Sequence, residues 1–372
     1  MRTTRLLTLV VAFAAGAFAS EAIAQLPSPG GLTTLVYWRD VTPAPNPTNH
    51  FKFIINNTNT TLGTFPNVCA NISSLAIYPM GRQFFVEDVL DPTRFGLIPD
   101  TLARKKQIRF VPERNSMITT VLTNFNNGPE YMDRPDPRWS SDNQDTFFTF
   151  TAYVPPKPTP WPGIPAFRKV YRFSGSKSIF WSPTFTPFVP LDPRLTLAAS
   201  ITVDSTVNDW NSTGQRLVFS TPGPLGPVTR TVPFQGTMLT STIVNNPSVS
   251  GFTLLNPVCS PTNADVVYSV VETAGGLRGI AAFNTQSQTL GFIILEGGVG
   301  LNAISNFTTP QVSPDGRTLA FTMLRTLQSP TTGTKPGVSL VRIPVTGGVY
   351  SPLWTTSDRV NNFEVTGWTA SP

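Results

Sequence analysis

A single histidine limits the acid–base chemistry that this chain can perform. His50 is the only histidine among 372 residues, and a Ser-His-Asp or Cys-His mechanism would have to use it. It lies at the start of an expected strand, and no Gly-x-Ser-x-Gly elbow is present in the sequence. We interpret His50 as a structural or surface residue. The sequence therefore favours a non-enzymatic protein, without deciding the question.

Ligands for a metal or a cofactor are sparse. The sequence has no His or Cys cluster suited to zinc or iron, and Gly275-Gly276 and Gly347-Gly348 indicate hairpin turns rather than phosphate-binding loops. The run from Glu130 to Asp136 offers carboxylates to calcium, but its spacing fits no known loop and Arg134 and Arg138 can neutralise it. We favour a charged turn there, with a weak calcium site not established, and we expect no cofactor.

The first 24 residues have the pattern of a secretory signal peptide. Two arginines precede an apolar run from Leu6 to Phe18, and Ala22-Ile23-Ala24 provides a small-residue cleavage site. No later segment approaches the roughly 20 apolar residues that a membrane span needs. We predict cleavage after Ala24 and a mature chain, residues 25–372, that is periplasmic or secreted.

The basic residues and the cysteines suggest no special partner. The formal net charge is +6, and the densest basic stretch, Arg104-Lys105-Lys106, reads as a solvated strand and loop rather than a nucleic-acid patch. We therefore expect no nucleic-acid partner. Cys69 and Cys259 could pair in an oxidising compartment, but the repeats described next place them far apart. We favour two buried thiols.

One motif recurs along the chain and predicts an all-β repeat architecture. In its clearest copy, Thr309–Thr322, Pro314-Asp315-Gly316 forms a turn and Leu319-Ala320-Phe321 continues as a strand. Copies recur at intervals of roughly 50 to 70 residues, which is enough for four short strands and their loops. The six equivalent positions, which we call the repeat anchors, are Tyr78, Ser140, Asn211, Ser260, Ser313 and Thr369.

The two ends of the chain complement each other in this pattern. The sixth copy has a first strand, Phe363–Trp368, and then the chain stops. Strand-like segments at Leu35–Trp38, Phe51–Ile55 and Thr60–Phe65 can supply three more strands, and such pairing removes exposed sheet edges. We predict a single six-bladed β-propeller over residues 25–372, closed by pairing N-terminal strands with the C-terminal strand.

The residues Pro310, Ser313–Arg317 and Leu319–Phe321 resemble the β-propeller repeat of the TolB type. This repeat is also found in the propeller domains of prolyl-oligopeptidase-like enzymes. The resemblance implies a propeller fold for nearly the whole mature chain and, by similarity to TolB, protein interactions in the cell envelope. The N-terminal domain that accompanies the propeller in TolB has no counterpart in this sequence, so the resemblance does not imply a place in the Tol–Pal system.

Our candidate binding residues lie near the expected channel. Arg138, Asp209 and Gln311 stand two positions before repeat anchors, where they suit a polar group or a peptide backbone; bonds to neighbouring blades are the simpler interpretation. Glu364 lies in the first strand of the sixth copy. Trp161 belongs to a proline-rich insertion that could present it to a partner or form a rigid loop over a blade edge.

These observations lead to three functional hypotheses. We favour an exported, non-enzymatic scaffold that binds a protein or peptide partner through one mouth of the channel. The alternative is an extracellular propeller enzyme acting on a carbohydrate or lactone through converging acidic residues, with Asp136, Asp209 and Glu364 as candidates. A purely structural surface module would instead have no polar pocket at either mouth.

Overall fold

The fold was analysed in a computed structural model of the chain. The structure describes residues 32–40, 48–55, 58–65, 73–75, 82–90, 104–111, 120–121, 138–139, 146–151, 168–173, 184–188, 192–202, 204–211, 215–298, 303–329, 333–356 and 360–370. Side chains are described within residues 168–368. Over these ranges the protein is almost entirely β-strand, as the sequence predicts.

The N-terminal half of the chain supplies most strands of three sheets. One sheet joins the two ends of the chain in the order β26-β1-β2-β3, and a second has the order β4-β5-β6-β7. A third has the order β15-β11-β10-β9-β8, in which β15 is the only described strand that pairs in parallel. The bounds are β1 Leu32–Asp40, β2 Thr48–Ile55, β3 Thr58–Phe65, β4 Ser73–Leu75, β5 Arg82–Leu90, β6 Arg104–Val111, β7 Thr120–Val121, β8 Arg138–Trp139, β9 Thr146–Thr151, β10 Arg168–Phe173, β11 Thr196–Ile201, β15 Gly236–Thr237 and β26 Val360–Ala370.

The C-terminal half supplies three further sheets. Their orders are β12-β13-β14-β16, β17-β18-β19-β20 and β21-β23-β24-β25, with β22 also paired to β23. The bounds are β12 Thr206–Asn211, β13 Arg216–Thr221, β14 Val228–Pro233, β16 Thr242–Asn245, β17 Phe252–Cys259, β18 Val266–Thr273, β19 Arg278–Asn284, β20 Thr289–Leu295, β21 Ile304–Ser305, β22 Gln311–Val312, β23 Thr318–Ser329, β24 Gly333–Pro344 and β25 Ser351–Thr356. Two short helical turns are described as well, η3 (Met238–Thr240) and α2 (Pro247–Ser250).

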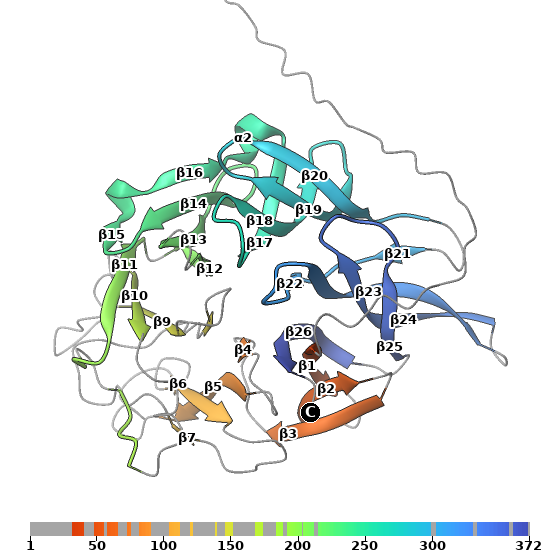
Figure 1. Ribbon diagram of the computed structural model, residues 1–372, viewed down its shortest axis with the longest axis horizontal. Helices are drawn as coiled ribbons and strands as arrows, with labels where there is room; N and C mark the ends of the chain where they lie inside the picture. The colour runs from red at the N-terminus through yellow and green to blue at the C-terminus, as the bar shows by residue number, and fades with distance from the viewer. Residues whose placement is uncertain are drawn as a thin grey trace, which may run out of the picture.

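The sheets stand around a central region, with one strand of each sheet lying nearest the centre (Figure 1). The chain enters most sheets at this inner strand and moves outward from hairpin to hairpin. Five of the six repeat anchors fall within or directly after a described strand of this kind: β8, β12, β17, β22 and β26. The repeat read from the sequence therefore marks the inner strand of five of the six sheets.

The turn of the clearest repeat forms as the sequence predicts. Gly316 has a φ of 71°, and its amide donates a 2.8 Å hydrogen bond to the carbonyl oxygen of Ser313. The Asp315 carboxylate accepts a bond from the Ser313 hydroxyl, while the Ser313 Oγ accepts the amide of Thr318 at 3.0 Å. A Cβ on Gly316 would lie 2.6 Å from Oγ1 of Thr262, so this turn also touches the equivalent turn of the neighbouring sheet.

In the part of the chain whose side chains are described, apolar residues fill the spaces between adjacent sheets. One cluster combines Val258, Tyr268 and Ile280 with Leu319 and Phe321, which belong to neighbouring sheets. Comparable clusters join β10 and β11 to β12 and β13, and β24 to β26. Because each sheet alternates its side chains between two faces, both faces become buried only when sheets stand side by side.

Candidate functional site

The carboxylate of Asp209 links two sheets at the inner end of β12. Its Oδ1 accepts the amide of Trp210 at 2.8 Å, and its Oδ2 accepts the amide of Cys259, in the next sheet, at 2.7 Å. Asp209 is 5% exposed. Both oxygens are thus used inside the protein, which agrees with the simpler interpretation of this position.

Cys259 is a free and fully buried thiol beside that carboxylate. Burial raises the pKa of the Cys259 thiol well above its ordinary value, and the negative charge of Asp209 and hydrogen bonding to it act in the same direction. The thiol is therefore protonated and unreactive at neutral pH. Cys69, the other cysteine, lies outside the described residues.

A second link between sheets involves Gln311, although through its backbone. The indole Nε1 of Trp368, on β26, donates a 3.2 Å hydrogen bond to the carbonyl oxygen of Gln311 on β22. The guanidinium carbon of Arg342, on β24, lies 4.9 Å from the centre of the Trp368 ring. Burial lowers the pKa of Arg342 to about 10, so it still carries its charge at neutral pH. This cluster anchors the C-terminal strand to its neighbouring sheet.

The remaining sequence candidates are placed by backbone only or lie outside the described residues. Arg138 is in β8, which lies against β12, and Glu364 is in β26, which lies against β22. His50 is in β2, opposite Trp38 and Thr64 of the adjoining strands. Trp161, Asp136 and the Glu130–Asp136 run fall outside the described ranges, and their roles stay predictions.

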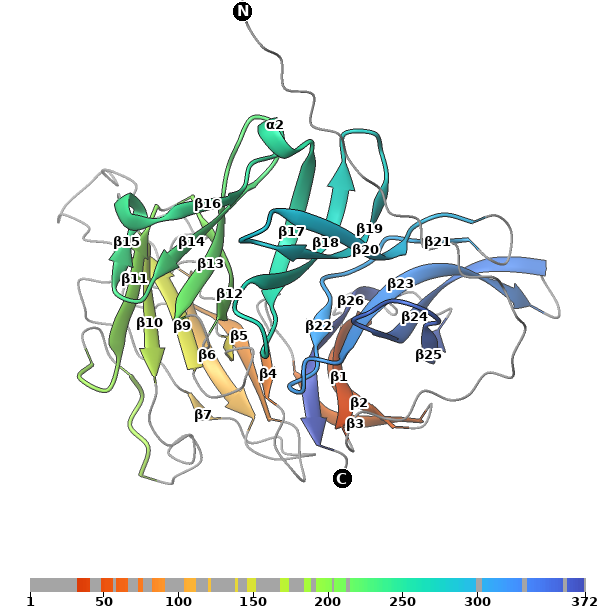
Figure 2. The ribbon, with the colours of Figure 1, turned by 45° about the horizontal axis from the view of Figure 1, so that its top comes forward.

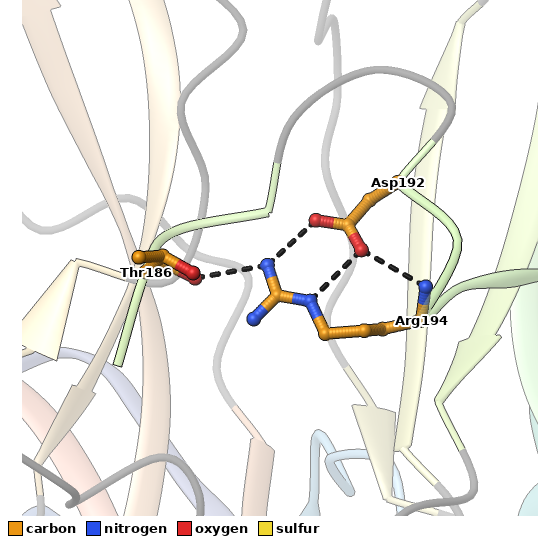
Figure 3. A network of polar contacts seen from close by, with 3 residues as sticks. All are labelled: Thr186, Asp192 and Arg194. Carbon is orange, nitrogen blue, oxygen red and sulfur yellow. Dashed lines mark hydrogen bonds and ion pairs between the residues drawn. The ribbon is translucent and has the colours of Figure 1, made fainter. Parts of the chain in front are cut away.

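A polar and aromatic cluster fixes the connection that precedes β11, and Figure 3 shows its polar contacts. Arg194 forms a two-pronged ion pair with Asp192, at 2.8 and 2.6 Å, and donates to the carbonyl oxygen of Thr186 at 2.9 Å. Its guanidinium carbon also lies 5.5 Å from the ring centre of Phe185 and 4.6 Å from that of Phe188. The bond to Asp192 raises the pKa of Arg194. The aromatic face is thus already occupied by the protein's own cation, so we interpret the cluster as structural.

Three large exposed apolar side chains lie on connections that contact one common segment, residues 251–253. Leu225, Val249 and Leu277 are 68%, 81% and 51% exposed, and they come from the β13–β14 turn, from α2 and from the β18–β19 turn. We call these three residues the apolar patch. Single exposed apolar residues are ordinary, but a group of them marks an interaction surface.

The three connections that carry the apolar patch meet at the beginning of β17. The carbonyl oxygen of Gly251, which caps α2, accepts a 2.8 Å hydrogen bond from the amide of Ala274 in the β18–β19 turn. Gly226, in the β13–β14 turn, lies so close to Thr253 that a Cβ there would be 2.9 Å from Oγ1. Figure 2 shows α2 at the top of the molecule beside β17. Residues 251–253 therefore hold all three connections together.

The sequence contained a signal for this patch that pattern reading missed. Leu225 stands within Pro222-Gly-Pro-Leu-Gly-Pro227, and Leu277 follows Gly275-Gly276. An apolar residue at the tip of a Gly- or Pro-rich turn has no core to enter, because turn tips project into solvent. That the β13–β14 turn, α2 and the β18–β19 turn contact one segment depends on how the sheets pack, which the local sequence does not indicate.

Among the residues with described side chains, no group of three or more His, Cys, Asp or Glu could hold a metal ion. None of the helices within the described residues is long and apolar enough to span a membrane.

Comparisons with known proteins identify the fold. No protein-family model matches the chain, and no curated protein matches it in sequence. Among solved structures, TolB from Acinetobacter baumannii matches with a TM-score of 0.52 at 12% identity, over 92% of this chain and 67% of that one. A prolyl endopeptidase matches with a TM-score of 0.45 at 12% identity, over 89% of this chain and 42% of that one. The periplasmic gluconolactonase PpgL of Pseudomonas aeruginosa matches with a TM-score of 0.42 at 10% identity, over 90% of this chain and 99% of that one. The chain spans less than half of the peptidase. The four-stranded antiparallel sheets of this chain are arranged as in β-propeller proteins.

Proposed function

We propose that this protein is an exported, non-enzymatic scaffold that binds a protein partner, and that the apolar patch is a contact surface for that partner. The observation that carries the proposal is that three connections, each with an exposed apolar side chain (Leu225, Val249 or Leu277), contact one segment, residues 251–253. Export rests on the signal-peptide pattern of residues 1–24.

Covering the patch is favourable for a simple physical reason. The three side chains keep half or more of their surface in water, and each Å² of apolar surface removed from water stabilises a complex by roughly 25 cal/mol before the costs of association. The supporting turns are also preorganised. Gly251 and Ala274 are hydrogen-bonded to each other, so little ordering is needed when a partner arrives.

We also propose that the sheets close into one six-bladed ring formed by residues 25–372. Contacts between inner strands support this proposal, because each of them lies against the next in the series β4, β8, β12, β17, β22, β26 and β26 also lies against β4. The pairing of β26 with β1, in which Val36 lies opposite Val365, joins the two ends of the chain within one sheet. A ring of this kind gives a rigid support for surface loops.

The channel-mouth residues named from the sequence remain a second proposed contact region. Arg138, Glu364 and Gln311 keep this role as predictions. For Asp209 the described hydrogen bonds favour an inter-sheet role, because both carboxylate oxygens already accept backbone amides. The same bonds weigh against Asp209 as one of two catalytic carboxylates, because a buried and bonded oxygen does not reach a substrate.

The proposal can be tested by site-specific photo-cross-linking in the organism that makes the protein. A photoreactive amino acid is placed at Leu277 in one version of the chain and at Val349 in a matched control. Val349 is 74% exposed and lies in the β24–β25 turn of another sheet. A defined adduct from position 277 that is absent from position 349 would support the apolar patch. Identical adduct patterns from both positions would count against it.

A further inference from the structure

A negatively charged side chain stands beside the apolar patch. Glu272 is exposed and lies on β18, directly opposite Thr253 of β17, the residue on which the Leu225 turn rests. Its other cross-strand neighbour is Arg278 of β19. Within the part of the chain that the structure describes, the side chain of Glu272 forms no hydrogen bond or ion pair.

Arg278, the nearest cation on the sheet, is already neutralised by another carboxylate. Its Nη1 lies 2.9 Å from Oε1 of Glu296 and contacts Oδ1 of Asn306 at 3.5 Å. The same Oε1 of Glu296 accepts the amide of Phe307 at 3.0 Å, which holds the pair in place. The guanidinium of Arg278 is therefore held by Glu296 of β20, and no described ion pair joins it to the Glu272 side chain.

We propose that the apolar patch takes a segment of a partner protein in which a Lys or Arg side chain lies next to apolar side chains. This inference rests on the proposed function and specifies its partner. The apolar side chains would cover Leu225, Val249 and Leu277, and the cation would face Glu272. An acidic segment would bring a like charge against Glu272, which disfavours binding. The overall charge of the chain is +6, which favours acidic partners, whereas the negative charge of Glu272 favours a basic side chain at this one place.

The test uses a library of displayed random 12-residue peptides selected on the immobilised mature chain. Peptides are kept if they bind the wild type and are lost on a variant with Leu225→Ser, Val249→Ser and Leu277→Ser. We expect these patch-dependent peptides to be enriched in Lys or Arg beside Leu, Ile or Phe. Their affinity should fall about tenfold in Glu272→Lys and less in Glu272→Gln, and the difference between variants should shrink at high salt.

A charge reversal elsewhere provides the control. Asp265→Lys changes a carboxylate in the β17–β18 turn, at the opposite end of β18, and should leave binding unchanged. Melting temperatures confirm that each variant is folded. Patch-dependent peptides without basic residues, or with equal affinity for wild type and Glu272→Lys, would overturn the inference while leaving the proposed function standing.

Two other outcomes are also decisive. If no patch-dependent peptide is selected, both the inference and the proposed contact surface fail. If the wild type sediments as a dimer and the triple serine variant as a monomer, the occupant is a second copy of this chain, and the inference of a basic partner segment is overturned.

Discussion

Oδ2 of Asp209 lies 2.7 Å from the backbone nitrogen of Cys259, 50 residues further along the chain in the next sheet. In the repeat numbering, Asp209 stands two positions before its anchor and Cys259 one position before the next. A related link joins Trp368 and Gln311. Trp368 stands one position before its anchor, and its indole donates to the carbonyl oxygen of Gln311, which stands two positions before the preceding anchor. At Asp209 and Gln311, the positions two before an anchor thus join successive sheets.

Removing the Asp209 carboxylate should destabilise the protein more than removing an exposed one. In Asp209→Ala the buried amides of Trp210 and Cys259 lose their acceptor, which costs roughly 2–4 kcal/mol. Asp209→Asn keeps one acceptor oxygen and should cost less. Urea unfolding measures these changes, with the exposed Asp204→Ala as control. Equal stabilities for Asp209→Ala and Asp204→Ala would contradict the assigned link.

Stability should fall in alkaline solution because of the Cys259 thiol. Burial, and then Asp209, raise its pKa in the folded state well above 9.0, whereas the unfolded chain ionises near the ordinary value. The contribution is therefore complete below that ordinary pKa and is lost as the pH rises beyond it. We expect the free energy of unfolding to fall more steeply between about pH 8.5 and 10.5 in the wild type than in Cys259→Ala. Parallel pH profiles would show that the thiol is not held neutral.

Two glycine variants separate backbone strain from steric contact. Gly316 and Gly276 both have left-handed φ values, 71° and 81°, so alanine costs about 1–2 kcal/mol at either position. At Gly316 the new Cβ would also press on Thr262, while at Gly276 it would meet no atom within 4 Å. We expect Gly316→Ala to lower the melting temperature clearly more than Gly276→Ala, and Thr262→Ala to restore part of that difference. Equal losses would mean that the two turns do not touch.

The Trp368 indole should contribute to holding β26. In Trp368→Phe the carbonyl of Gln311 loses its donor and the contact of the Arg342 guanidinium weakens, which together cost about 1–3 kcal/mol. Because β26 is the last strand that the structure describes and Trp368 lies on it, hydrogen exchange of the β26 and β1 amides should increase before exchange elsewhere. Unchanged exchange in these two strands would contradict the role assigned to this cluster.

The sequence was informative about strands and turns because these depend on neighbouring residues. Pro314-Asp315-Gly316 forms its turn through bonds within six residues, and Gly347 and Gly348 take positive φ values in the expected β24–β25 turn. The alternation of Val338 to Ile343 likewise marks β24. The all-β class and the four-stranded antiparallel sheets could therefore be predicted.

The surface was less predictable because it depends on contacts between distant segments. Nothing local to Asp209 shows that its carboxylate will meet an amide 50 residues away. Similarly, Leu225 and Leu277 lie in separate turns, and both turns contact residues 251–253, one through Gly226 and the other through Ala274. Sheet stacking decides both cases, and a single sequence carries little direct record of it.

The most direct test of the central claim is quantitative capture of the partner that cross-links to position 277. The captured amount is compared for wild type, for the triple serine variant of the apolar patch and for Val349→Ser, with each variant shown to be folded by its melting temperature. Our account predicts that the patch variant loses about 90% or more of the captured partner. Three truncated contacts are expected to cost well over about 1.4 kcal/mol of binding free energy, which equals a factor of ten in affinity. Val349→Ser should capture as much partner as the wild type. Equal capture by the patch variant and the wild type would show that the partner binds elsewhere and would contradict the assignment of the apolar patch.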